Sequence, residues 1–325
     1  MRKLGGIWSL EDLANYRLIE RQPLIGEYRG VRIVTAPPPS SGGIAVLNAL
    51  NILDGYELAQ LDSATRKHVI IESLRRVHRD RAEYLGDPAF VSMPIQRLLS
   101  PDYAAGNAPR FVSTAPLRAS ALPGYIGDTS SGVSTTHFAI LDREGNRVAV
   151  TITLNAWFGT GLVIPGTGIL LNNEMDDFAI KPGEPNIYKL VGAEANSIAP
   201  GKRPLSSMTP TFLESERGIA ILGSPGGSFI PSMVLLGTSQ LAQRRRCRWA
   251  SSPRRASITS TSRTWCSPSP KASREEERQS LEQRGHKFRD WPPTIGNMQV
   301  ITWDYATQSV VAASDPRGVG EGMVR

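Results

Sequence analysis

The sequence of 325 residues predicts an α+β fold, because its two halves differ in their periodicity. Apolar residues at helical spacing dominate before residue 105, whereas short β-type runs separated by Gly-rich turns dominate after residue 135. The stretch 105–134 is rich in Ala, Gly, Ser and Pro and has no periodicity, which is typical of a linker. We therefore expect two regions, 1–134 and 135–325.

Three helices and a strand region are expected in the first half. Leu10 to Tyr16 has the pattern of a short amphipathic helix, and strand-like runs follow around Tyr28 to Thr35. The Pro-rich and Gly-rich stretch Pro37 to Gly43 interrupts any regular element. An apolar helix is expected from Ile44 to Leu53. Leu61 to Tyr84 combines helical spacing with many charges, which predicts a long helix packed at the surface.

Strands replace helices at Thr135. His137 to Leu141 and Arg147 to Leu154 are short β-type runs, and Arg143 to Asn146 between them is a hairpin signal. A further strand, Gly218 to Leu222, leads into a Gly-rich loop. The second half is therefore expected to be rich in strands.

The net charge of +7 is concentrated in one window. Arg244 to Lys271 contains seven arginines, one lysine and no acidic residue, so this window carries +8 and the rest of the chain −1. Both cysteines, Cys247 and Cys266, also lie in it, which leaves no disulfide framework or thiolate metal site elsewhere. Because the remainder is nearly neutral, we expect no nucleic-acid partner; a polybasic nucleic-acid patch is the alternative for the window.

The sequence lacks the motifs of several protein classes. It has no P-loop, dinucleotide fingerprint, HExxH or CxxC pair, and its four histidines are scattered, so no metal or cofactor is expected. No apolar run approaches the roughly 18 residues of a membrane span. Met1 to Lys3 leads into Gly5 and Gly6 rather than into an apolar signal core, so the chain as written has no export signal.

Two places could supply a nucleophile. Ser224 precedes two glycines but lacks the flanking pattern of a nucleophile elbow, and we expect no strand-to-helix turn there. Thr135 begins a Thr-Thr-His run where the linker meets the hairpin. Its α-amine, with an ordinary pKa of ~7.7 to 8.0, could act as base if the bond after Ser134 were cut. The alternative is that Thr135 and Thr136 merely start a strand.

Long motifs resolve this choice through a resemblance. The second half resembles the small subunit of the γ-glutamyltransferases, and the first half resembles the end of their large subunit. The motifs that carry the resemblance are Gly5-Gly6, Tyr28 to Gly30, Pro37 to Gly43, Arg81 to Pro88, Thr135 to His137, Thr151 to Asn155, Phe158 to Gly161, Gly168 to Phe178, Lys202 to Pro210, Gly223 to Ser228 and Ser314 to Arg317. They occur in the family's order and cover nearly the whole chain except the basic window.

The resemblance implies a catalytic set. Thr135 would be the nucleophile after the chain cuts itself before that residue, and the hydroxyl of Thr153 would position it. Gly226 and Gly227 would form the oxyanion hole. Tyr188 would be a lid-loop aromatic over the glutamyl pocket; the alternative is a surface aromatic.

It also implies residues that bind the substrate. The substrate's α-ammonium would be held by Asn155, Glu174 and Asp177, and its α-carboxylate by Ser206 and Ser207. Solvated loop acids and a simple turn are the alternatives.

From the resemblance we expect a four-layer αββα sandwich of the N-terminal-nucleophile type and a periplasmic or extracellular location. The reaction would be γ-glutamyl transfer from, or hydrolysis of, glutathione and related amides. Its partners would be a γ-glutamyl donor, an amino-acid or peptide acceptor and water, in an enzyme whose large and small subunits come from one precursor. No metal or cofactor is implied.

The chain departs from the family pattern in two ways. The family precursor has a long region before the start of this chain, including an arginine that clamps the substrate carboxylate, so we expect a truncated reading frame. Within window 244–271, GC-rich codons for Arg254 to Cys266 can be translated in the neighbouring frame. The translation contains His-His-Gln-Tyr-Leu-Pro-Asp, which resembles the family's motif at this place. We therefore expect a frameshift that begins near Gln243 and ends near Ser273.

An inactive, truncated and frameshifted remnant is the alternative to an active enzyme. Loss of the arginine clamp would remove a contact worth ~1.5 to 3 kcal/mol. Without further chain to cover it, the Thr135 hairpin would have an exposed apolar face and an unpaired edge. We therefore expect little or no activity from residues 1–325 as written.

Overall fold

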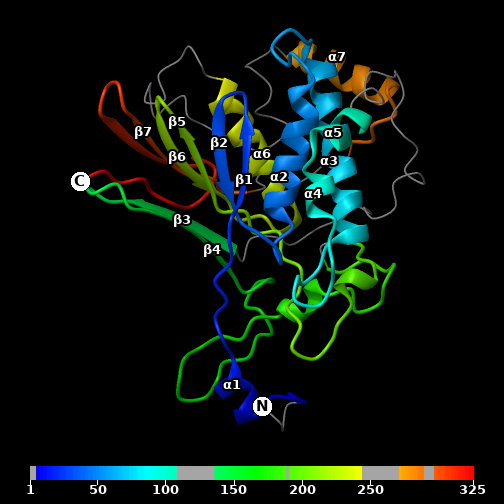
Figure 1. Ribbon diagram of the computed structural model, residues 1–325, viewed down its shortest axis with the longest axis vertical. Helices are drawn as coiled ribbons and strands as arrows, with labels where there is room; N and C mark the ends of the chain where they lie inside the picture. The colour runs from blue at the N-terminus through cyan, green and yellow to red at the C-terminus, as the bar shows by residue number, and fades with distance from the viewer. Residues whose placement is uncertain (1–4, 108–134, 188–189, 244–270, 289–295) are drawn as a thin grey trace.

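The computed structural model describes residues 5–107, 135–187, 190–243, 271–288 and 296–325 (Figure 1). Helices and strands are mixed as the α+β prediction requires. The helices are α1 (Leu10–Asn15), α2 (Gly42–Asp54), α3 (Ser63–Tyr84), α4 (Ile95–Leu98), α5 (Pro101–Asn107), α6 (Ile230–Gln243) and α7 (Lys271–Gln283), with 3-10 turns η4 (Glu174–Asp177), η5 (Glu194–Asn196) and η6 (Gly227–Phe229). The strands are β1 (Leu24–Tyr28), β2 (Val31–Thr35), β3 (Thr135–Leu141), β4 (Arg147–Thr153), β5 (Thr211–Ser215), β6 (Gly218–Gly223), β7 (Gln299–Asp304) and β8 (Ser309–Ser314).

Six strands form one antiparallel sheet in the order β1-β2-β5-β6-β7-β8. The two regions of the chain share this sheet, because β1 and β2 come from the first half and the other four strands from the second. Helices α2 and α6 pack together beside it, and α3 packs on α2 (Figure 1). The main core lies between these helices and the sheet, with Val46, Leu50, Leu213 and Leu222 fully buried in it.

The hairpin of β3 and β4 is a separate two-stranded sheet that packs on β6 and β7 (Figure 1). Its turn is closed by Asp142, whose carboxylate accepts the backbone N–H groups of Glu144 and Asn146. An ion pair of 2.6 Å from Arg147 to Glu214 ties the hairpin to β5. All six residues of β6 are buried, as expected for a strand covered on both faces.

The four-layer sandwich is seen only in part. In the described ranges no helix covers the outer face of the hairpin, and Phe138, Ile140, Val148 and Ile152 are 45, 51, 43 and 58% exposed there. The prediction that this hairpin would have an exposed apolar face is confirmed for the part of the chain that the structure describes. None of the described helices is long and apolar enough to cross a membrane.

One boundary was predicted wrongly. Residues 105–107, which were assigned to the linker, belong to α5. The start signal was present in the sequence: the Ser100 hydroxyl accepts the N–H of Tyr103, Pro101 is the first helical residue, and Asp102 lies in the first turn. The remainder of the linker and window 244–270 lie outside the described residues.

Candidate active site

Thr135 is the first residue of β3 and lies directly opposite Thr153 of β4. Its hydroxyl donates a hydrogen bond to the Thr153 hydroxyl at 2.9 Å. Side chains alternate along a strand, so Thr135 and His137 point toward the six-stranded sheet while Thr136 and Phe138 point away. The alternation that predicted the hairpin therefore also places the Thr135 hydroxyl on the covered face.

Thr153 connects the hairpin to the loop that follows it. Its hydroxyl oxygen accepts the backbone N–H of Asn155 at 2.8 Å. Asn155 is buried, has a φ of 70°, and donates from its side-chain amide to the carbonyl of Asn173 at 3.1 Å. A continuous set of hydrogen bonds thus runs from Thr135 to the residue that precedes Glu174.

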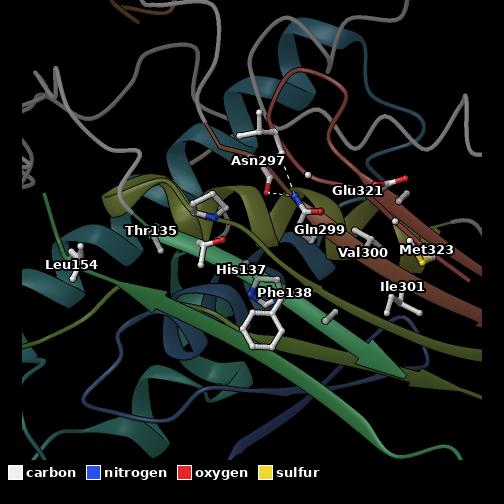
Figure 2. A pocket seen from close by; sticks show the side chains of 18 of the residues that line it. Thr135, His137, Phe138, Leu154, Asn297, Gln299, Val300, Ile301, Glu321 and Met323 are labelled. Atoms are coloured by element: carbon white, nitrogen blue, oxygen red, sulfur yellow. Dashed lines mark hydrogen bonds between the residues drawn. The ribbon is translucent and has the colours of Figure 1, made fainter. Parts of the chain in front are cut away.

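A cavity of about 750 Å³ opens beside Thr135. Figure 2 shows Thr135 and His137 of β3 on its wall, with Gln299 and Val300 of β7 across from them. Pro225, next to the predicted oxyanion glycines, lines the same cavity. The hydroxyl of Thr135 therefore borders a space into which a small molecule could enter.

His137 is buried behind the nucleophile candidate. Its Nδ1 lies 2.8 Å from the Thr151 hydroxyl, and burial lowers its pKa to about 4, so the ring is neutral at neutral pH. A Cβ added to Gly223 would lie 2.2 Å from the ring. Only glycine lets β6 approach the ring this closely, so His137 sets the contact between β3 and the end of β6.

The Gly-rich loop joins β6 to η6 and α6, which corrects the expectation that no strand-to-helix turn occurs here. The rejection of Ser224 as an elbow nucleophile still fits the geometry, since Ser224 is fully buried and its hydroxyl donates to the Pro225 carbonyl. Gly226 and Gly227 have φ of 138° and 54°, conformations that glycine adopts readily. A side chain on Gly226 would also collide with Met233.

Glu174 and Asp177 form a carboxyl pair on η4, in which the charge of Asp177 acts on Glu174. Burial, followed by the charge of Asp177, raises the pKa of Glu174 to about 8. Burial also raises the pKa of Asp177 to about 6, although the nearby Arg81 opposes this rise. Such a pair holds a proton near neutral pH and would favour a cation in its place.

Ser206 lies in a short parallel bridge with Ser40. Its carbonyl accepts both the N–H and the hydroxyl of Ser41 at 2.8 Å, and its own hydroxyl accepts the N–H of Met208 at 3.1 Å. The Ser207 carbonyl accepts the Thr209 hydroxyl. This turn is thus held through backbone atoms, while both serine side chains remain partly exposed.

The structure brings the predicted residues together unevenly. Thr135, Thr153 and Asn155 form one hydrogen-bonded group, whereas Glu174 and Asp177 form a separate carboxyl pair. Neither this pair nor Ser206 and Ser207 line the large cavity. Tyr188 lies outside the described residues. The described ranges contain no group of three or more His, Cys, Asp or Glu side chains that could hold a metal ion.

Arg81 was not predicted as a site residue from the sequence, although it is the first residue of the family motif Arg81 to Pro88. Arg81 is buried and interacts with both Asp177 and the Ser41 hydroxyl. The available signal was an arginine whose neighbours four residues before and after it, Val77 and Leu85, are apolar.

The fold defines a class of protein first. It matches the crystal structure of cephalosporin acylase from Bacillus halodurans with a TM-score of 0.74, covering 99% of this chain and 57% of that chain at 24% sequence identity. The chain therefore shares with that acylase a mixed fold of helices and antiparallel sheets. The sequence narrows this class to a family. The family model described as Gamma-glutamyltranspeptidase matches residues 1–324, and the chain belongs to this family of enzymes.

Individual relatives agree with this assignment. The glutathione hydrolase proenzyme of Escherichia coli (strain K12) is 46% identical over 239 residues, which are 72% of this chain and 41% of that protein. The glutathione hydrolase proenzyme of Pseudomonas aeruginosa is 35% identical over 334 residues, which are 100% of this chain and 58% of that protein. The chain thus spans about half the length of the curated relatives it matches.

Proposed function

We propose that the protein transfers or hydrolyses γ-glutamyl groups through an acyl-enzyme on Thr135. The observation that carries the proposal is the Thr135 hydroxyl, hydrogen-bonded to Thr153 at the first position of β3 and bordering a cavity. An N-terminal threonine is a usable nucleophile because its own α-amine can take the hydroxyl proton. The glutathione hydrolase names of the relatives support glutathione as a donor.

The first chemical step forms a bond from the Thr135 hydroxyl oxygen to the γ-carbonyl carbon. The hydroxyl proton passes to the α-amine and then to the leaving amine as the carbon–nitrogen bond breaks. Water, or the amine of an amino-acid or peptide acceptor, next attacks the carbonyl carbon of the ester. The bond from that carbon to the Thr135 oxygen breaks, and a proton of the attacking group passes through the α-amine to the Thr135 oxygen. Backbone N–H groups of Gly226 and Gly227 would stabilise the oxyanion, a contribution of about 2.7 to 4 kcal/mol for one donor in a well-studied hydrolase.

The α-amine exists only after the peptide bond between Ser134 and Thr135 breaks. We propose that the precursor performs this cut itself, giving a region 1–134 that belongs to the large subunit and a small subunit that begins at Thr135. The proenzyme names of the relatives support maturation from a precursor. The whole protein would then form the four-layer αββα sandwich and act in the periplasm or outside the cell.

The two ends of the glutamyl group would be held by different segments. The α-ammonium would be held by Asn155, Glu174 and Asp177. Burial raises the pKa values of both carboxyl groups, so a bound cation would stabilise their ionised forms. Ser206 and Ser207 would donate to the α-carboxylate. Tyr188 would cover the pocket.

The test expresses residues 1–325, with window 244–271 restored to the family's frame, within a precursor as long as the curated relatives, together with its Thr135→Ala and Thr135→Ser variants. Mass spectrometry should find a fragment that begins at Thr135 in the parent chain and in Thr135→Ser, and a single uncut chain in Thr135→Ala. Release of an amine from a γ-glutamyl anilide should follow the cut. Normal cleavage in Thr135→Ala would remove Thr135 from the mechanism.

A further inference from the structure

A buried cation connects the two segments that the proposed function assigns to the ends of the substrate. Arg81 of α3 is 5% exposed. Its Nε donates to the Ser41 hydroxyl at 3.1 Å, and one terminal nitrogen lies 3.5 Å from the Leu205 carbonyl. The Ser41 hydroxyl in turn donates to the Ser206 carbonyl at 2.8 Å. Arg81 therefore fixes the backbone of the serine segment through two routes.

The same guanidinium acts on the acid pair. Its charge opposes the rise in the pKa of Asp177, and the charge of Asp177 partly offsets the burial that lowers the pKa of Arg81 to about 10. Arg81 therefore stays protonated at neutral pH. The other charged groups that act on Asp177 are Glu174 and Asp176. Arg81 is thus the cation that acts on Asp177, whereas its neighbour Asp176 acts in the opposite direction.

A neutral side chain joins the same two segments. Asn196 is 3% exposed and follows the carboxyl pair along the chain. Its amide nitrogen donates to the Asp177 carbonyl at 2.7 Å, and its amide oxygen accepts the N–H of Leu205 at 3.1 Å. One buried amide thus spans from the backbone of the acid segment to the residue before Ser206.

We propose that Arg81 and Asn196 are positioning residues that fix the spacing between the carboxyl pair Glu174–Asp177 and the serine segment at Ser206. This inference rests on the proposed function, in which the pair and the serines bind the ammonium and the carboxylate of one α-carbon. Both groups of that carbon must be matched at once, so a displacement of about 1 Å between the segments would weaken binding strongly. A guanidinium suits this task because its donors have a fixed geometry and can reach the Ser41 hydroxyl and the Leu205 carbonyl at once.

The experiment compares four variants of residues 1–325 within the same relative-length precursor that tests the proposed function. Arg81→Gln removes the charge, Arg81→Lys keeps the charge without the fork, and Asn196→Ala removes the amide. Arg79→Gln is the matched control, because Arg79 lies on the same helix and is partly exposed. Isothermal titration with L-glutamate gives the Kd, and ¹³C NMR of the carboxyl groups follows the titration of the pair.

We expect Arg81→Gln to raise the Kd for glutamate at least tenfold and to move the titration of the pair to higher pH. Arg81→Lys should raise the Kd while leaving the titration near its original place, and Asn196→Ala should behave likewise. The control should match the parent chain in both measurements.

Each result decides a different point. Folded Arg81 and Asn196 variants with an unchanged Kd and titration would overturn the inference. Variants that unfold altogether, the lysine and alanine changes included, would assign these residues to stability alone and also overturn it. A parent chain that binds no glutamate, combined with a shifted titration in Arg81→Gln, would reject the proposed function while the coupling of Arg81 to the pair stands.

Discussion

At the scale of single residues, the surroundings of Thr135 follow from the register of one hairpin. The pairing of Thr135 with Thr153 brings two hydroxyl groups within 2.9 Å on the covered face of β3 and β4. A shift of one residue would turn both hydroxyls to the exposed face. The buried ring of His137, held between Thr151 and Gly223, opposes such a shift.

Thr153→Val should slow both the cut before Thr135 and turnover. Valine has the shape of threonine but leaves the Thr135 hydroxyl and the Asn155 N–H without their partner. A net loss of about 0.5 to 1.5 kcal/mol corresponds to a roughly two- to tenfold lower rate. The measurement is the rate of fragment formation and of anilide cleavage. Thr307→Val, in the turn after β7, is the matched control, and equal rates for the two variants would show that the hydroxyl pair has no role.

The carboxyl pair predicts a pH dependence of stability. The pKa of Glu174 in the fold is about 8, above its ordinary value of 4.5, so the folded state binds a proton that the unfolded state has lost in this range. Stability contributed by this proton is present below about pH 4.5 and is lost as pH rises through about 8. The melting temperature of the ligand-free chain should therefore fall more between pH 5 and 8 than that of Glu174→Gln.

Glu216→Gln changes an exposed position and is the control. Its melting temperature should fall between pH 5 and 8 as much as that of the parent chain. L-glutamate should restore stability at pH 8, since its ammonium would take the place of the proton. Identical slopes for the parent and Glu174→Gln would mean that the pair is fully ionised near neutral pH.

The candidate residues differ in how far the sequence could reveal them. Thr135 could be named because its neighbours in sequence form a long motif and an alternating strand. The position of Arg81 could not, because its partners Ser41, Asp177 and Leu205 come from three distant segments that meet only in the fold. The local sequence pattern predicts the helix or strand to which a residue belongs. The partners of a buried charged side chain depend on tertiary packing, which this pattern does not contain.

At the scale of elements, α7 docks on α3 through polar groups. Nε2 of His286 lies 2.7 Å from Nδ1 of His68, and Glu277 accepts from Lys67 and Ser63. Arg284 donates to the Thr65 hydroxyl at 2.7 Å. These contacts attach a helix that begins at Lys271, the last residue of the basic window.

This docking should weaken in acid. Burial, the nearby charge of His68 and the cations Arg75 and Arg284 lower the pKa of His286 to about 4, although Glu72 opposes them. Because the pKa is depressed, the stability of docking is present above about pH 6.5 and is lost as pH falls through about 4.

Methyl NMR of Leu281, which is buried in the docked helix, should report this loss between pH 6.5 and 4. His286→Gln should flatten the change, and Arg278→Gln on the exposed side of α7 should leave it intact. A pH profile that is the same in His286→Gln would contradict the role of the histidine pair.

The hairpin makes a second prediction at this scale. Its outer face exposes Ile140 and Ile152, and exposed apolar strands promote association. The double change Ile140→Thr and Ile152→Thr should reduce self-association in sedimentation experiments without lowering the melting temperature. A clear drop in melting temperature would instead show that other parts of the chain cover this face.

The elements also show where pattern reasoning works. The long helix α3 was predicted from helical spacing over many residues, and the hairpin from two short β-type runs with a turn signal, Arg143 to Asn146, between them. Helix α5 was missed because its seven residues are too few to show a period, and its capping signal at Ser100 to Asp102 carried the information instead. The order of strands in the sheet, which places β2 beside β5, depends on packing between distant segments.

At the scale of the whole molecule, both regions contribute to one sheet and one candidate site. The first region supplies Ser41 and Arg81, and the second supplies the hairpin, the carboxyl pair and the Gly-rich loop. A cut before Thr135 would therefore separate two chains that remain joined through β2, β5 and the core between α2 and α6. The two fragments should consequently elute together in size-exclusion chromatography after cleavage.

The central claim is that Thr135 becomes an N-terminal nucleophile that carries the glutamyl group. The most direct measurement is intact-mass spectrometry of the relative-length precursor after acid quenching of a reaction with a γ-glutamyl anilide. We predict a fragment whose N-terminal residue is Thr135 and which carries the added mass of one glutamyl group on that residue. An adduct on another residue, or turnover by a chain that remains uncut at Thr135, would contradict the account.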